Sequence, residues 1–349
     1  MKKLSVLFAA ALLAGTAFAA TARAGDELTV VSWGGAYSVS QHKAFIEPYM
    51  AAGNKVTEAE YNGEVAKIKA MVEAKAVTWD VIDADSPTAM QACAEGALET
   101  IDWGKLGFDK SKFMGSDFLD CAVPNIIYGT VFGYDTSKIT ANPPTTINDF
   151  FDTVKYPGKR GLWNNPQVNM EWALIVDGVD PKDVYRVLGT PEGLDRAFKK
   201  LDTIKKDIVW WTSGAQAPQL LADGQVAMTS AWNGRLYDAV KKDNKPFKIV
   251  WDHQALDWDY WVITKDTPKM EEAYRFVAYS SDPQRMANQT QFISYGPSNT
   301  DAIPMVAADM LPNLPTAPEN LKTAWQLDSQ FWADHGDEIK ERFNAWLAQ

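Results

Sequence analysis

Short apolar stretches that end in glycine or aspartate, each followed by a stretch with helical periodicity, recur along this chain. Residues 28–33 predict a strand, two glycines end it, and residues 37–50 predict a helix. The same order returns with a strand at 79–84 and a helix at 87–98, which Asp85 and Ser86 are placed to cap. Strands and helices that alternate in this way are typical of α/β proteins.

The alternation continues through the second half of the chain. Further strands are predicted at 128–134, 207–211, 225–231, 247–251 and 260–264, and from residue 269 onward the pattern is mostly helical, ending in a helix over 323–347. No glycine- or serine-rich linker divides the chain. If the chain forms two lobes, we therefore expect strands that cross from one lobe to the other to join them.

Residues 1–24 have the three parts of a secretory signal peptide. Lys2 and Lys3 form a basic start, residues 4–20 are almost entirely apolar, and Ala22-Arg23-Ala24 fits the cleavage pattern. We therefore predict a periplasmic protein. Without this segment the chain carries 31 basic and 45 acidic residues, a net charge of −14. Because nucleic-acid binding depends on basic residues that neutralise phosphates, this balance argues against a nucleic-acid partner.

The chain lacks the common sequence motifs of catalysis. G-x-S-x-G, the Walker A loop, G-x-G-x-x-G and H-E-x-x-H are absent. The histidines His42, His253 and His335 are far apart in sequence, so we expect neither a metal nor a cofactor. Export places Cys93 and Cys121 in an oxidising compartment, where we expect them to pair; two buried free thiols are the alternative.

Several of the 14 tryptophans lie at predicted strand ends beside glycine or aspartate. Trp33 precedes two glycines, Trp232 precedes an asparagine and a glycine, and Trp258 lies between Asp257 and Asp259. Ligands of α/β proteins bind beyond the carboxyl ends of strands. Aromatic faces attract a cation, and a carboxylate adds charge-assisted hydrogen bonds. The three tryptophans are therefore candidate contacts of an amine ligand, with core or lobe packing as the alternative.

Six short motifs follow one another behind the predicted signal peptide. They are S-W-G-G-A-Y at 32–37, W-D-V-I-D-A-D-S at 79–86, A-W-N-G-R at 231–235, D-W-D-Y-W at 257–261, Y-G-P-S-N at 295–299 and W-Q at 325–326. With these motifs in this order, the whole mature chain resembles the periplasmic solute-binding proteins of spermidine/putrescine-type ABC importers.

The resemblance implies a type II periplasmic-binding-protein fold. This is an α/β architecture of two lobes, each with a mixed sheet flanked by helices, and the ligand cleft lies between the lobes. Lobe one would comprise residues 25–134 and about 258–312, and lobe two about 135–257 and about 313–349. The hinge would lie near 133–135 and 252–257, and ligand binding would close the lobes. The resemblance also implies an inner-membrane permease as partner and a monomeric state.

The resemblance further implies which residues contact the ligand. Trp33 matches a position that stacks on the alkyl chain of the ligand, and Asp259 matches a carboxylate that binds an amino group, with Asp257 as the alternative. The implied contacts are Trp33, Gly34, Tyr37, Asp85, Ser86, Glu171, Trp232, Asp257, Trp258, Asp259, Tyr295 and Gln326.

Arg235 departs from what a polyamine site requires. A guanidinium is a poor neighbour for a diammonium ligand but a good bidentate clamp for a carboxylate. Opposite Asp259, it would suit a zwitterion with separated charges, such as γ-aminobutyrate. The main expectation is a small amine such as putrescine or spermidine, the alternative is an ω-amino acid held by Arg235 and Asp259, and a structural role for Arg235 stays open.

Two other functions would use the same residues. A secreted hydrolase could act through the carboxylates Asp257, Asp259 and Glu171, because carboxylate pairs alone can run glycoside chemistry. An extracytoplasmic sensor would bind its ligand just as a transport protein does. We expect a solute-binding protein of an importer, and not an enzyme.

Overall fold

The computed structural model describes residues 27–115 and 117–349. The predicted signal peptide, residues 1–24, lies outside the described residues. Among the helices that are described, none is both long and apolar enough to cross a membrane.

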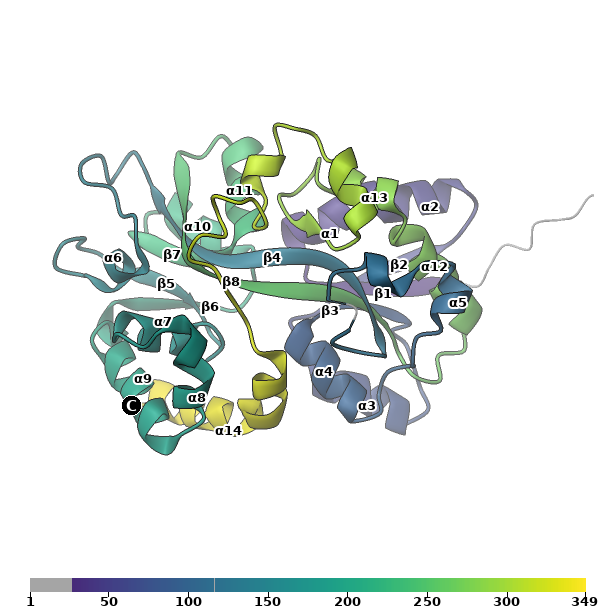
Figure 1. Ribbon diagram of the computed structural model, residues 1–349, viewed down its shortest axis with the longest axis horizontal. Coiled ribbons are helices and arrows are strands. Elements are labelled where there is room, and N and C mark those ends of the chain that lie inside the picture. The colour runs from purple at the N-terminus through teal and green to yellow at the C-terminus, as the bar shows by residue number, and fades with distance from the viewer. Residues whose placement is uncertain (1–26, 116) are drawn as a thin grey trace, which may run out of the picture.

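A single continuous sheet runs through the molecule in the order β2-β1-β3-β8-β4-β7-β5-β6 (Figure 1). Two short strands lie off this path: β9 pairs with β4, and β10 pairs with β8. The strands are β1 (Leu28–Ser32), β2 (Val56–Glu60), β3 (Val81–Asp85), β4 (Ala122–Asp135), β5 (Arg160–Trp163), β6 (Ile208–Trp211), β7 (Met228–Trp232), β8 (Phe247–Ile263), β9 (Gly296–Pro297) and β10 (Trp325–Gln326).

β4 and β8 extend through both halves of the molecule (Figure 1). β3 pairs with residues 259–263 of β8, whereas β7 pairs with residues 130–134 of β4. The pairing of β4 with β8 shifts register twice, between Pro124 and Ile126 and between Thr130 and Phe132. Strands therefore cross between the two halves, as the absence of a linker predicted.

Helices cover both faces of the sheet in each half (Figure 1). The half that contains β1–β3 carries α1 (Gly35–Gln41), α2 (Glu47–Ala51), α3 (Val65–Glu73), α4 (Ser86–Ala94), α5 (Trp103–Leu106), α12 (Met270–Ser280) and α13 (Pro283–Gln289). The half that contains β5–β7 carries α6 (Ile147–Phe151), α7 (Asn169–Val176), α8 (Val184–Leu188), α9 (Pro191–Asp202), α10 (Gln216–Ala222), α11 (Asn233–Lys241) and α14 (Ser329–Leu347). A π-helical turn, η1 (His42–Ile46), joins α1 to α2, and the 3-10 turns are η2 (Lys110–Lys112), η3 (Pro181–Asp183), η4 (Lys205–Asp207), η5 (Thr300–Met305) and η6 (Leu311–Asn313).

Local signals in the sequence explain how the helix nearest the site begins. The carboxylate of Asp85 accepts a hydrogen bond from the backbone N–H of Thr88 at 3.2 Å, so it is the N-cap of α4, as predicted. Pro87 occupies the first turn, where its missing N–H costs nothing. Cys93 in α4 is joined by a disulfide to Cys121, directly before β4. The N-cap at the start of α4 and the disulfide near its end therefore both hold this helix in place.

Candidate functional site

Four carboxylates gather on one face of the antiparallel pair formed by β3 and β8. Asp83 and Asp85 alternate along β3, and Asp257 and Asp259 alternate along β8, with Asp85 directly opposite Asp259. Because side chains two apart on a strand point to the same face, all four carboxylates lie on the same side of the sheet. None is more than 5% exposed. Buried carboxylates in this number require protons, donors or a cation.

Asp83 and Asp259 form a coupled pair. One Asp83 oxygen accepts hydrogen bonds from Tyr37 Oη at 2.9 Å, Gln41 Nε2 at 2.7 Å and Asn125 Nδ2 at 2.7 Å. Burial raises the pKa of Asp83 to about 6, and burial together with the Asp83 charge raises the pKa of Asp259 well above its ordinary value. Since the three donors stabilise the ionised form of Asp83, Asp259 is the member that holds the proton.

Asp257 is held by donors of the protein itself. Ser86 Oγ donates to one of its oxygens, Tyr128 Oη donates to the other at 3.1 Å, and the backbone N–H of Trp258 donates at 2.8 Å. Burial and the neighbouring Asp85 charge raise its pKa to about 8. Asp257 and Ser86 therefore lie beside the small cavity of this site but do not line it.

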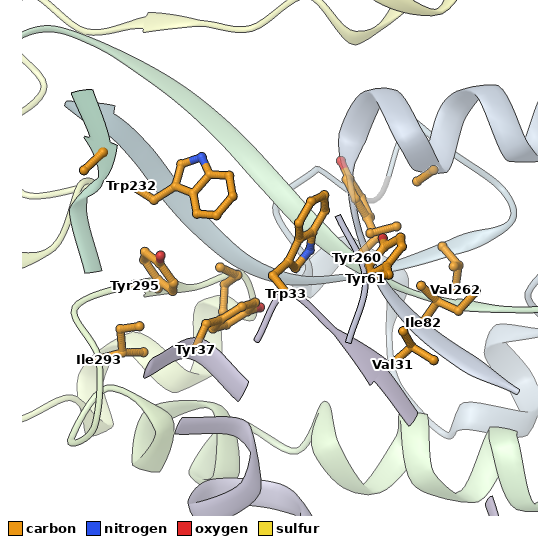
Figure 2. Close-up of a cluster of buried hydrophobic side chains, with 14 of the residues drawn as sticks. Val31, Trp33, Tyr37, Tyr61, Ile82, Trp232, Tyr260, Val262, Ile293 and Tyr295 are labelled. Carbon is orange, nitrogen blue, oxygen red and sulfur yellow. The ribbon is translucent and has the colours of Figure 1, made fainter. Parts of the chain in front are cut away.

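Aromatic rings form the walls beside the carboxylates. The Trp33 ring lies 4.9 Å from that of Tyr61 and 5.8 Å from that of Trp232, and Figure 2 shows it between these two side chains. The rings of Tyr37 and Tyr295 meet edge to face at 5.2 Å. Trp33 directly follows β1 and Trp232 ends β7, so the two strand ends bring these walls together from opposite halves of the sheet.

Two further tryptophans fix the orientation of Trp232. Trp163 at the end of β5 and Trp211 at the end of β6 stack at 6.0 Å, and their rings contact Trp232 at 5.7 and 5.6 Å. The sequence analysis did not single out either residue. Both follow the rule that led to Trp33 and Trp232, because each is a tryptophan at the carboxyl end of a strand.

Arg235, in the first turn of α11, is buried without a counter-ion. Its Nη1 donates to the carbonyl of Gly34 at 2.6 Å and its Nη2 to the carbonyl of Trp33 at 3.2 Å, while Nε has no partner. Among the described residues, no carboxylate lies within ion-pairing distance of this guanidinium, which is 2% exposed. Gly34 has φ +67° and ψ −179°, a backbone conformation that favours glycine.

A small cavity lies between these groups. Its empty volume, which includes space open to solvent, is about 270 Å³. We call it the inner cavity, and its lining residues are Trp33, Tyr37, Asp85, Tyr128, Trp232, Arg235, Asp259 and Tyr295. All of these except Tyr128 belong to the set proposed from the sequence. Nothing in the sequence distinguished Tyr128, which lies inside a long apolar strand.

Three residues of the proposed set lie away from the inner cavity. Glu171 in α7 accepts hydrogen bonds from Tyr185 Oη at 3.0 Å and Trp332 Nε1 at 2.8 Å, and burial raises its pKa to about 7. Gln326 is exposed on β10. Trp258 alternates with the carboxylates on β8, so it points to the opposite face of the strand, where it meets Phe118 at 5.7 Å.

Comparison with known proteins places the chain among binding proteins. The family model of bacterial extracellular solute-binding proteins matches residues 44–316. A γ-aminobutyric acid-binding protein of Pseudomonas aeruginosa is 41% identical over 345 residues, which cover 98% of this chain and 97% of that protein.

Solved structures agree in fold over nearly the whole chain. The periplasmic binding protein MotA of A. tumefaciens B6, in complex with glucopine, has a TM-score of 0.86 at 30% identity and covers 92% of this chain and 99% of its own. The GABA receptor Atu4243 has a TM-score of 0.81 at 34% identity, with 93% and 98% covered. These similarities confirm the predicted α/β architecture with two lobes and a cleft between them.

Proposed function

The chain belongs to the bacterial extracellular solute-binding proteins, and on this premise we propose that its inner cavity captures an ω-amino acid such as γ-aminobutyrate. The chain is a solute-binding component of an ABC transporter, and its relatives bind solutes instead of converting them. The carboxylates of the site therefore act in binding, and the alternative of a secreted hydrolase is set aside.

The observation that carries the proposal is the unpaired guanidinium of Arg235. A buried cation without a counter-ion is unfavourable by several kcal/mol unless a ligand supplies the missing charge. Arg235 lines the inner cavity and keeps an unpartnered Nε. A ligand carboxylate would satisfy this cation, whereas the second ammonium of putrescine would repel it.

The part of the inner cavity lined by carboxylates favours a positively charged group of the ligand. Asp85 and Asp259 line it, and Asp83 lies directly behind Asp259. An ammonium group placed there would replace the proton that Asp259 holds and would face the rings of Trp33 and Trp232. A zwitterion with separated charges satisfies both parts of the cavity at once. We therefore favour the ω-amino acid over the polyamine.

The lobes, the hinge and the location complete the proposal. Lobe one would comprise residues 25–134 and about 258–312, and lobe two the remainder of the mature chain, with the hinge near 133–135 and 252–257, where β4 and β8 pass from one lobe to the other. Residues 1–24 would direct the chain to the periplasm, where the loaded monomer would dock on an inner-membrane permease. Differential affinity for the closed state would drive closure.

A titration of ligand-free protein tests the ligand class. The protein is unfolded and refolded to remove bound solute, and isothermal titration then compares γ-aminobutyrate, putrescine and spermidine. We expect γ-aminobutyrate alone to bind the wild type. Arg235→Gln should weaken γ-aminobutyrate by about 100-fold, because one charged hydrogen-bonded partner is lost. Binding of putrescine with equal affinity in both proteins would refute the zwitterion and make Arg235 structural.

A further inference from the structure

A groove lies at the edge of the sheet, between β1 and β2 on one side and α1 and η1 on the other. Its empty volume, which includes space open to solvent, is about 640 Å³. We call it the edge groove. It shares no lining residue with the inner cavity, and all of its walls belong to the half that contains β1–β3. Because β2 is the outermost strand of the sheet, the groove is accessible from solvent on that side.

Two carboxylates lie along one wall of the edge groove. In the parallel register of β1 and β2, Glu58 is the partner of Val30 and Glu60 is the partner of Ser32, and all four residues line the groove. His42 Nδ1 lies 2.7 Å from Glu58 Oε1. Glu60, by contrast, makes no hydrogen bond or ion pair with any residue that the structure describes. The groove therefore contains a carboxylate whose charge has no partner.

The Glu60 side chain turns back over the end of β1. A β-carbon at Gly34 would lie 2.5 Å from Glu60 Oε2, so the carboxylate packs against the backbone of Gly34. The N–H of Gly34 already donates to Ser38 Oγ at 2.9 Å, and it is therefore not a donor for the carboxylate. The carboxylate thus lies at this end of the groove without a donor from the protein.

Ser32 supplies a second group without a partner. It is 5% exposed, and its hydroxyl makes no hydrogen bond within the described part of the chain. A buried hydroxyl without a partner is unfavourable unless a ligand or a water satisfies it. Because Ser32 lines the groove beside Glu60 on the neighbouring strand, its hydroxyl and the Glu60 carboxylate can both accept hydrogen bonds from one donor group.

The chemistry of the groove favours an organic cation over a metal ion. Among the described residues, no group of three or more histidines, cysteines or carboxylates could hold a metal ion. A primary ammonium has three N–H donors, which match two carboxylates and a hydroxyl. Val30, Ile46 and Ala59 form the apolar part of the walls, against which a short carbon chain would be buried.

We propose that the edge groove binds a small primary alkylammonium ion. Its ammonium lies between Glu60 and Ser32, and its carbon chain packs along Val30 and Ile46. The site is distinct from the inner cavity, and the inference does not depend on the proposed function. Since every wall of the groove belongs to one half of the molecule, an inner cavity that is filled with its own ligand should leave the groove available.

Three probes test the proposal on the ligand-free mature protein at low ionic strength. Isothermal titration compares n-butylammonium, the neutral 1-butanol and calcium chloride, with and without saturating γ-aminobutyrate. We expect n-butylammonium to bind under both conditions, and 1-butanol and calcium to bind at least about tenfold more weakly, because 1-butanol lacks the charge and calcium lacks enough ligands. Displacement of n-butylammonium by γ-aminobutyrate would place the amine in the inner cavity and overturn the proposal. Tighter binding of calcium would also overturn it.

Two variants locate the amine in the edge groove. Glu60→Gln should weaken n-butylammonium by at least about tenfold and Ser32→Ala by about 3- to 10-fold. Glu73→Gln, at an exposed position of α3, is the matched control and should leave its affinity unchanged. All three variants should melt no lower than the wild type, which shows that they fold.

An unchanged affinity for n-butylammonium in Glu60→Gln would refute the edge groove as its site. If γ-aminobutyrate does not bind the wild type, the proposed function fails by itself, because the comparison of Glu60→Gln with Glu73→Gln needs no ligand in the inner cavity.

Discussion

Asp259 is the residue whose protonation should change most when a ligand binds. In the empty protein it shares a buried environment with Asp83, Asp85 and Asp257, and it holds a proton because burial and the Asp83 charge raise its pKa. An ammonium group can enter only where a carboxylate is ionised or becomes so. Ligand binding should therefore exchange a proton for a cation.

This exchange predicts a pH dependence of binding. Since the proton on Asp259 leaves when the ammonium arrives, affinity should rise with pH, by up to about tenfold per unit, as long as the pH lies below the pKa of Asp259 in the ligand-free protein, and it should fall when the ligand amine deprotonates near pH ~10. Titrations of γ-aminobutyrate at pH 7 in buffers with different ionisation enthalpies should show about one proton released. A binding heat that does not depend on the buffer would mean that Asp259 is already ionised in the empty protein.

Glu171 gives a second prediction, on stability. Its pKa is raised to about 7 by burial, so between its unfolded value and pH 7 the folded protein binds more protons than the unfolded chain. The stability of the ligand-free protein should therefore fall as pH rises through this range, with Glu171 contributing at most about 3 kcal/mol. Glu171→Gln keeps an acceptor for Trp332 and Tyr185 and removes the titration.

Denaturant unfolding at pH 5 and pH 8 measures this contribution. We expect the decrease in unfolding free energy between the two pH values to be smaller in Glu171→Gln than in the wild type. Glu338→Gln, an exposed position on α14, should behave as the wild type does. An equal decrease in all three proteins would show that Glu171 does not titrate differently on folding.

At the residue scale, the sequence allowed most of the inner cavity to be predicted. Seven of its eight lining residues were proposed: Trp33 and Trp232 from their places at predicted strand ends, and the others from the family resemblance or, for Arg235, from a departure from it. Tyr128 was not, because a tyrosine inside an apolar strand has no local feature that separates a ligand contact from a core residue. Glu171 was proposed as a ligand contact but lies away from the inner cavity, where it accepts hydrogen bonds from Tyr185 of α8 and Trp332 of α14.

Among the elements, α14 connects the two halves of the molecule. Its apolar face packs Phe331, Trp332 and Phe343 into the core of the half with β5–β7. Its first residue, Ser329, contacts Ser86 of α4 in the other half, with 2.5 Å between the two hydroxyl oxygens. Ser86 in turn donates to Asp257. The start of α14 therefore stabilises the arrangement in which the cleft is narrow.

Ser329→Ala should weaken γ-aminobutyrate modestly. One hydrogen bond between the halves is lost, which corresponds to about 0.5–1.5 kcal/mol, or roughly 2- to 10-fold in affinity, and mainly to faster dissociation. Stopped-flow dissociation measures this rate. Gln330→Ala, at the next and exposed position, is the control and should dissociate as the wild type does. An unchanged rate in Ser329→Ala would show that this contact does not stabilise the closed arrangement.

The strands include two elements that were not predicted correctly from the sequence. Two strands, at 247–251 and 260–264, were predicted where the structure has the single strand β8, Phe247–Ile263. The acidic residues Asp257 and Asp259 interrupt the apolar pattern because their carboxylates face the site and not the core. A polar interruption within a strand was therefore a functional signal. Similarly, Trp325–Gln326 pairs with β8 as the short strand β10, a long-range contact that local periodicity does not encode.

At the scale of the whole molecule, the two halves depend on β4 and β8 for their connection. Their pairing shifts register after Thr130, close to where the hinge is proposed. Arg235 also crosses this boundary, because it sits on α11 in the half with β7 and donates to the carbonyls of Trp33 and Gly34 in the half with β1. A single guanidinium thus belongs to the interface between the halves and to the proposed ligand clamp.

This double role predicts how closure responds to ligand. Small-angle scattering should show a smaller radius of gyration for the wild type with saturating γ-aminobutyrate than without it. Arg235→Gln should be more expanded than the wild type when empty, since it loses two hydrogen bonds between the halves, and γ-aminobutyrate should fail to compact it. Arg342→Gln removes a partly exposed arginine of α14 that pairs with Asp195, away from the cleft, and should compact normally. If Arg235→Gln compacts with γ-aminobutyrate as fully as the wild type does, closure depends on the carboxylates and aromatic walls alone, and the guanidinium serves only to hold the loop after β1.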